Sequence, residues 1–163
     1  ERAAEKADVM VSSGGVSGGE EDHSKDVVDS LGGIDLWKVS IKPGKPFAFG
    51  TVNGTPFLGL PGNPSSVLVT CLIIARPYLL RCQGLNNTSV NPLRRPALFT
   101  RNQAFRTEYL RVRSTPEGLE CYPQQSSGVL LSTVWGDGLA IHREGEKIDM
   151  SQEIDFLPYS FLL

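Results

Sequence analysis

Three short runs rich in glycine, proline and small polar residues carry the chemistry in this chain of 163 residues. They are GGVSGGEED (14–22), KPGKP (42–46) and LPGNPSS (60–66). Together they offer backbone N–H groups free of bulky side chains, serine hydroxyls, two lysine ammonium groups and three carboxylates. Such a set suits a phosphate or another oxyanion with a divalent cation nearby.

Each run ends an apolar segment that reads as a strand. The segments begin at Asp8, Lys38 and Pro56, and each stops in glycine, proline and hydroxyl residues. This is typical of parallel strands where they leave the core of a sheet. Ligands of open α/β sheets bind at those carboxyl ends, so we expect the three runs to meet at one edge of one sheet.

In this order and spacing, the runs resemble the molybdopterin molybdenumtransferase family, which includes MoeA and the E domain of gephyrin. The match is specific because GGVS-x-GE-x-D, KPGKP and LPGNP-x-S occur together. It covers the chain from about Asp8 onward. The resemblance implies an α/β fold: a truncated, MogA-like three-layer molybdopterin-binding domain, followed by a small all-β, barrel-like domain. Because the family's domain begins with a further strand and phosphate loop, we expect a C-terminal portion of a longer protein.

The resemblance also implies roles for individual residues. Asp22 would hold Mg²⁺, with Glu20 and Lys45 as further catalytic residues. Residues implied to bind the pterin substrate or molybdate are Gly14, Gly15, Ser17, Lys42, Gly44, Pro61, Gly62, Asn63, Ser66, Arg111 and Ser127. Gly18 stands where the family usually has a larger apolar residue, which leaves the first loop more flexible.

Simpler interpretations of several of these residues stay open. Glu20 and Asp22 could lie at the start of a helix, where the dipole favours negative charge. A KPG turn is often a solvated corner, Asn63 suits a helix N-cap, and Arg111 could lie on the polar face of a strand.

Composition divides the chain near residue 84. Glycine is concentrated before Asn63, and a polar connector follows Gly84 and ends at Pro92. Upstream, we expect a helix over 24–31 and a buried, all-round apolar helix that starts at Pro64, is disturbed by Pro77 and ends by Gly84. Downstream, the apolar residues alternate with period two, which predicts β structure. The predicted domains are therefore 1–84 and 92–163.

Net charge, cysteine spacing and the length of apolar runs give no indication of a nucleic-acid, zinc-binding or membrane protein. A net charge of −2 gives no electrostatic reason to expect nucleic acid or an anionic membrane as a partner. The three cysteines lack the paired spacing of a zinc or redox site. The apolar run at 67–75 is much shorter than the roughly 20 residues of a membrane span, so cytoplasmic location is the default expectation.

The activity implied by the resemblance is Mg²⁺-dependent insertion of molybdate into adenylated molybdopterin with release of AMP, by a homodimer. The isolated fragment is expected to be inactive. Two alternatives are a gephyrin-like scaffolding module and a competence-damage-type nucleotide pyrophosphatase that shares the fold. KPGKP and LPGNP together with a C-terminal β domain favour the transferase.

Overall fold

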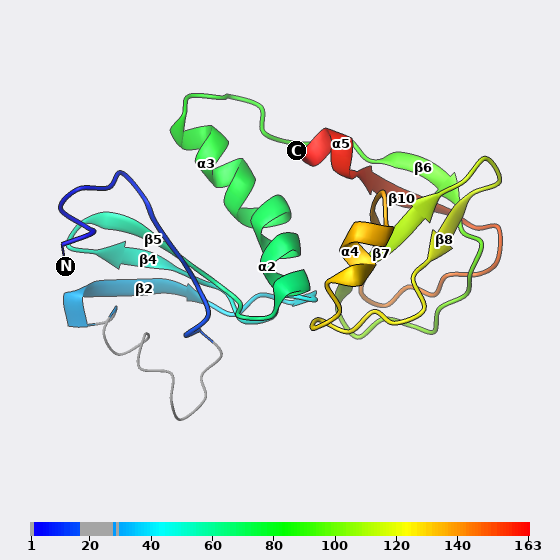
Figure 1. Cartoon of the computed structure of the whole chain (residues 1–163), viewed down its shortest axis with the longest axis horizontal. Helices are drawn as coiled ribbons and strands as arrows, with labels where there is room; N and C mark the ends of the chain where they lie inside the picture. The colour runs from blue at the N-terminus through cyan, green and yellow to red at the C-terminus, as the bar shows by residue number, and fades with distance from the viewer. Residues whose placement is uncertain (1, 17–27, 29) are drawn as a thin grey trace.

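The structure, a computed structural model, describes residues 2–16, 28 and 30–163. It has two lobes, each with its own sheet, and a long helix between them (Figure 1). In the described part, the sheet of the N-terminal lobe has the order β1-β5-β4-β2. Its strands are β1 (Met10–Ser13), β2 (Gly32–Trp37), β4 (Ala48–Val52) and β5 (Thr55–Leu60). Strands β1 and β5 are parallel, and the other two pairs are antiparallel.

The expected parallel alignment is therefore only partly right. The segments that begin at Asp8 and Pro56 do form the parallel pair β1 and β5. The strand predicted over 38–41 is wrong, because β2 ends at Trp37 and Lys38 adopts a left-handed conformation with φ of 77°. That turn takes the chain out of the first sheet. Ile41–Lys42 then forms the short strand β3, which pairs with β7 in the other lobe.

The C-terminal lobe is built on a second sheet with the order β3-β7-β9-β10-β6, and β8 pairs with β7. The strands from residue 93 onward are β6 (Leu93–Pro96), β7 (Thr107–Ser114), β8 (Leu119–Cys121), β9 (Gly138–His142) and β10 (Glu153–Pro158). Two short helices accompany them, α4 (Leu131–Trp135) and α5 (Tyr159–Leu162). An isolated bridge between Ala97 and Leu119 brings the ends of the sheet together, which makes the lobe barrel-like without a closed barrel.

The helix between the lobes begins at Pro64, as predicted. It consists of α2 (Pro64–Thr70), a π-helical segment η1 (Cys71–Ala75) and α3 (Arg76–Cys82). The predicted disturbance before Pro77 is present as the π-helical segment, because proline cannot donate a hydrogen bond to the carbonyl of residue 73.

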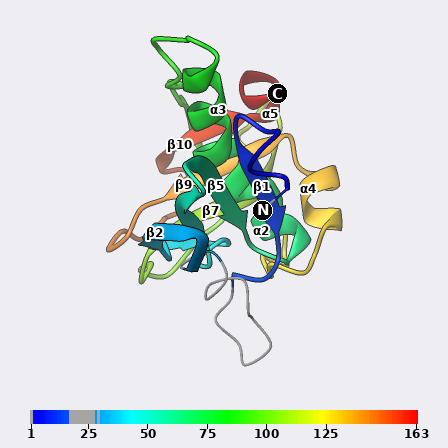
Figure 2. The ribbon, with the colours of Figure 1, turned by 90° about the vertical axis from the view of Figure 1, so that its left-hand side faces the viewer.

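The helix is apolar on all sides because it packs on both lobes (Figures 1 and 2). Val69 and Leu72 pack with Leu139 and Leu157 of the C-terminal lobe. Residues on the other side, such as Ala75, pack with the N-terminal sheet. As a 19-residue unit it is long and apolar enough to cross a membrane, contrary to the expectation from the 67–75 run. One such helix is weak support for a span, and its packing accounts for its composition.

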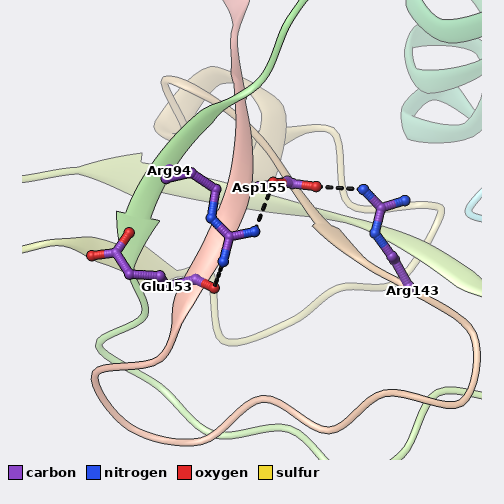
Figure 3. Close-up of polar contacts among 4 residues, drawn as sticks. All are labelled: Arg94, Arg143, Glu153 and Asp155. Atoms are coloured by element: carbon purple, nitrogen blue, oxygen red, sulfur yellow. Dashed lines mark hydrogen bonds and ion pairs between the residues drawn. The ribbon is translucent and has the colours of Figure 1, made fainter.

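A surface ion-pair group connects three strands of the C-terminal lobe (Figure 3). Asp155 on β10 accepts a hydrogen bond from Arg94 of β6 at 3.0 Å and another from Arg143, which directly follows β9. Arg94 also donates to the carbonyl oxygen of Glu153. Partial burial raises the pKa of Asp155, but the two guanidinium groups outweigh it and hold the pKa below its ordinary value.

Candidate functional site

A cleft of about 380 Å³ lies where the KPGKP loop, the start of α2 and the segment 125–127 meet. It contains six of the residues predicted for the site: Lys42, Gly44, Lys45, Asn63, Ser66 and Ser127. The other lining residues are Ile41, Pro43, Pro46, Arg106, Gln125 and Ser126. Two of the three chemical runs, 42–46 and 60–66, therefore do converge, and they meet residues of the C-terminal lobe.

The KPGKP loop is fixed by its contact with the central helix. Figure 1 shows the segment between β2 and β4 reaching toward the C-terminal lobe. Gly44 has φ of 114°, and a Cβ atom added there would lie 2.5 Å from Cγ2 of Thr70. Only glycine fits such a position. Pro43 and Gly44 are buried, while Lys42 and Lys45 on either side remain exposed toward the cleft.

The two lysines of the loop are not equivalent. Lys42 stands opposite Glu108 in the parallel pairing of β3 and β7, and its Nζ lies 2.8 Å from Oε1 of Glu108. Lys45 forms no ion pair with any residue in the described ranges. The free cleft therefore presents one compensated ammonium group and one uncompensated ammonium group.

Hydrogen bonds at the start of α2 join the two lobes. Asn63 occupies the N-cap position, but its side chain makes no capping bond. Its Nδ2 instead donates to Oγ of Ser127 at 3.0 Å. Ser65 donates from its backbone N–H to the carbonyl of Ser127 and from its hydroxyl to the carbonyl of Val129. Ser66 is buried, and it lines the cleft.

Arg111 lies behind the wall of the cleft. Its side chain is 1% exposed, so the interpretation as a solvated residue on a polar strand face is wrong. The guanidinium group donates to Oγ of Ser132 and to the carbonyl oxygens of Tyr109 and Ser126. Burial lowers the pKa of Arg111, although Tyr159 opposes this shift by favouring the charged form. The bond to Ser126 makes Arg111 a support of the 125–127 segment.

Gln125 completes that support. Its Oε1 accepts from the backbone N–H of Arg111, and its Nε2 donates to the carbonyl of the same residue, both at 2.9 Å. This reciprocal pair ties the segment that follows β8 back onto β7. It also places Ser126 and Ser127 at the cleft, opposite Asn63.

The remaining predicted residues lie at the first strand end or outside the described ranges. Gly14 donates its N–H to the carbonyl of Leu60, which brings Gly14 and Gly15 beside Pro61 and Gly62 at the ends of β1 and β5. Ser17, Glu20 and Asp22 fall outside the described residues. Among the residues that the structure does describe, no group of three or more histidine, cysteine or acidic side chains could hold a metal.

Sequence reasoning missed Arg106, Glu108 and Gln125. Gln125 lies only two residues before Ser127, which the resemblance does imply for the site. Arg106 and Glu108 reach the site because β7 pairs with β3. A two-residue strand leaves no periodic signal, so this pairing could not be read from the pattern.

Comparisons with known proteins agree with this architecture. Residues 1–81 match the family described as probable molybdopterin binding domain, and residues 99–159 match the MoeA C-terminal region, domain IV. A molybdopterin molybdenumtransferase of Haemophilus influenzae is 49% identical over 82 residues, which are 50% of this chain and 20% of that protein. A putative molybdopterin biosynthesis protein of Methanocaldococcus jannaschii is 30% identical over 155 residues, 91% of this chain and 37% of that protein.

A solved structure also resembles this chain. The MoeA protein of Pyrococcus horikoshii superposes with a TM-score of 0.76 at 27% identity, covering 97% of this chain and 39% of that chain. The N-terminal lobe thus matches a probable molybdopterin binding domain, and the C-terminal lobe matches the MoeA C-terminal region. The chain belongs to the MoeA family and corresponds to its C-terminal portion. It spans between a fifth and two fifths of the length of these relatives.

Proposed function

We propose that this chain forms the oxyanion-handling part of an enzyme that inserts molybdenum during molybdenum cofactor biosynthesis. The substrates would be adenylated molybdopterin and molybdate, and the products would be the molybdenum cofactor and AMP. The observation that supports this most is the convergence of Lys42, Lys45, Ser66 and Ser127 on one cleft between the lobes. Cationic and hydroxyl donors that meet at one point suit a tetrahedral oxyanion such as molybdate or phosphate.

Each donor has a distinct part in this proposal. The ammonium group of Lys45, which lacks an ion-pair partner in the described ranges, supplies the charge that attracts the oxyanion. Ser66, from the start of α2, and Ser127, from the segment after β8, supply hydroxyl donors. Asn63, Gln125 and Arg111 hold those walls in place. This arrangement can orient an oxyanion before any bond changes, which is how fixed donors lower a barrier.

Magnesium belongs to the same proposal. Asp22, with Glu20, would hold Mg²⁺, and the ion would neutralise phosphate charge as the phosphoanhydride is cleaved. We also propose that the protein acts in the cytoplasm as a homodimer. These parts rest on the resemblance of 14–22 to the family motif, and on the relatives' names as transferases of this pathway.

The test uses the longer protein that contains this chain. Lys45→Ala should abolish or strongly reduce molybdate-dependent release of AMP from adenylated molybdopterin. Lys147→Ala, which removes another exposed lysine, in the C-terminal lobe, should leave the rate unchanged. Equal rates for the wild type and Lys45→Ala would count against the proposed cleft chemistry. Asp22→Asn tests the magnesium site in the same assay, and a wild-type rate there would refute it.

A further inference from the structure

Phe105 is the feature that the proposed chemistry leaves unexplained. Its side chain is 97% exposed, whereas Ala104 just before it is buried. The ring has no aromatic or cationic ring contact with any residue in the described part of the chain. A fully solvated phenylalanine gains nothing from the hydrophobic effect, so a role in the fold does not account for it.

The loop that carries Phe105 is anchored. Ala104 donates its N–H to the carbonyl of Glu146 and accepts a hydrogen bond from Gly145, at 3.0 and 2.9 Å. On the other side, Thr107 begins β7 and stands opposite Ile41 of β3. Phe105 is therefore presented at a fixed place next to the KPGKP loop.

The surroundings of Phe105 are basic. A pocket of about 430 Å³ is lined by Phe105, Lys38, Lys45 and Arg106, together with Val39 and Ser40. This aromatic pocket has three cations and no acidic side chain among its described lining residues. None of the three forms an ion pair within the part of the chain that the structure describes.

The aromatic pocket and the cleft share a wall. Lys45 and Arg106 line both of them. Lys38 is held beside that wall by two backbone hydrogen bonds, from Lys38 to the carbonyl of Phe47 and from Val39 to the carbonyl of Lys45. Lys38 keeps its left-handed conformation there, with φ of 77°. A non-glycine residue in that region is held by its surroundings, and such residues concentrate at binding sites.

From these observations we propose that the aromatic pocket binds a phosphorylated nitrogen heterocycle, with the ring stacked on Phe105 and the phosphate on Lys45 and Arg106. Exposed aromatic rings beside cationic grooves are the usual platform for heterocyclic bases. The shared wall would then place the phosphate at the entrance of the oxyanion cleft. This inference rests on the proposed function for its natural ligand: adenylated molybdopterin carries two such rings, adenine and pterin.

Binding to the 163-residue chain tests the proposal without any assay of molybdenum insertion. Affinities for AMP, a phosphorylated pterin and ribose 5-phosphate would be measured by calorimetry or by NMR titration. Phe105→Ala should weaken the ring-bearing ligand about tenfold and leave ribose 5-phosphate unchanged. Arg106→Gln should weaken all ligands that bind. Phe161→Ala removes another exposed aromatic side chain, on α5, and should change none of them.

The outcomes distinguish adenine from pterin as the bound ring, and they test the aromatic pocket separately from the proposed function. A dependence on Phe105 for AMP alone assigns adenine to the pocket, and a dependence for the pterin alone assigns pterin. If neither ring-bearing ligand binds at millimolar concentration, or if Phe105→Ala affects ribose 5-phosphate equally, the proposal is overturned. Binding that depends on Phe105 would stand even if the longer protein fails to insert molybdate, so the two proposals can fail independently.

Discussion

Nζ of Lys42 lies 2.8 Å from Oε1 of Glu108, and this ion pair joins the KPGKP loop to the first residues of β7. The Glu108 side chain is 15% exposed and the Lys42 side chain 50% exposed, so the pair lies at the edge of the cleft. Because β3 has only two residues, the ion pair is one of few restraints that hold it on the second sheet. The same carboxylate also cancels a charge that an oxyanion could use.

Replacement of Glu108 by glutamine should therefore strengthen oxyanion binding. The change keeps the shape of the side chain but raises the net charge beside the cleft by one. We expect the affinity for a dianion such as molybdate or sulfate to rise roughly two- to fivefold at low salt, since Coulomb energies near a surface are on the order of 1 kcal/mol. Titration calorimetry would measure this, with Glu117→Gln in the exposed turn after β7 as the control. Weaker binding by Glu108→Gln would mean that the pair instead positions Lys42 for the ligand.

The difference between the two lysines gives a second prediction. Lys45→Ala should weaken the binding of molybdate about tenfold, on the scale of a hydrogen bond to a charged group. Lys42→Ala should have a smaller effect, because the ammonium group of Lys42 already donates to Glu108 and is less free to bond the oxyanion directly. The measurement is the dissociation constant of each variant in the same buffer. A larger loss for Lys42 than for Lys45 would contradict this assignment of charge.

The sequence predicted the convergence of the KPGKP and LPGNPSS runs for a partly incorrect reason. We expected both to follow parallel strands of one sheet. In the N-terminal sheet, as far as the structure describes it, only β1 and β5 are parallel, and the KPGKP loop reaches the cleft because β3 pairs in parallel with β7 of the other sheet. The motifs identified the residues, but the geometry that unites them depends on long-range pairing that local patterns do not encode.

Arg111 shows a second limit of pattern reading. Alternation along β7 places Arg111 with Tyr109 and Arg113 on the face that should be polar and solvated. In the structure α4 and the 125–127 segment cover Arg111 on that face, and Ser132 and Ser126 accept hydrogen bonds from its buried guanidinium group, whereas Arg113 stays exposed. Strand periodicity tells which residues share a face, but not whether a distant segment covers it. The central helix was easier to predict from the sequence, because Pro64 and Pro77 act locally through their missing N–H groups.

The ion-pair group at Asp155 predicts how stability depends on pH. The pKa of Asp155 is lower in the folded protein than its ordinary value near 3.9. The stabilisation of the folded protein by ionised Asp155 is therefore complete above about pH 5, and it is lost as the pH falls through the folded pKa. Because Arg94 and Arg143 are more than half exposed, we expect a contribution of about 1 kcal/mol or less.

Urea unfolding of the wild type and of Asp155→Asn at pH 7 and pH 3 tests this prediction. The wild type should be more stable at pH 7, and the difference should shrink at pH 3. Glu120→Gln, which changes an exposed carboxylate of β8, serves as the control. If the wild type gained stability relative to Asp155→Asn on acidification, the prediction would be wrong.

The contact between Gly44 and Thr70 supports the sharpest prediction about the loop. In Gly44→Ala, a new Cβ atom would lie 2.5 Å from Cγ2 of Thr70, at a backbone φ of 114° that alanine rarely adopts. Both effects should destabilise the chain, together by about 1 to 3 kcal/mol in urea unfolding. Since Gly44 lies between the two lysines, oxyanion binding should weaken as well.

Two further variants separate strain from steric overlap. Gly54 also has a positive φ, of 80°, but a Cβ added there would meet no atom within 4 Å. Gly54→Ala should therefore cost only the backbone strain and leave oxyanion affinity intact. Thr70→Ser removes the Cγ2 methyl group and keeps the hydroxyl that donates to the carbonyl of Ser66 at 2.8 Å. The double variant with Gly44→Ala and Thr70→Ser should recover part of the lost stability and affinity, because the overlap is gone and the strain remains. If the free-energy changes of the two single variants simply add in the double variant, the Thr70 methyl group does not hold the loop in place.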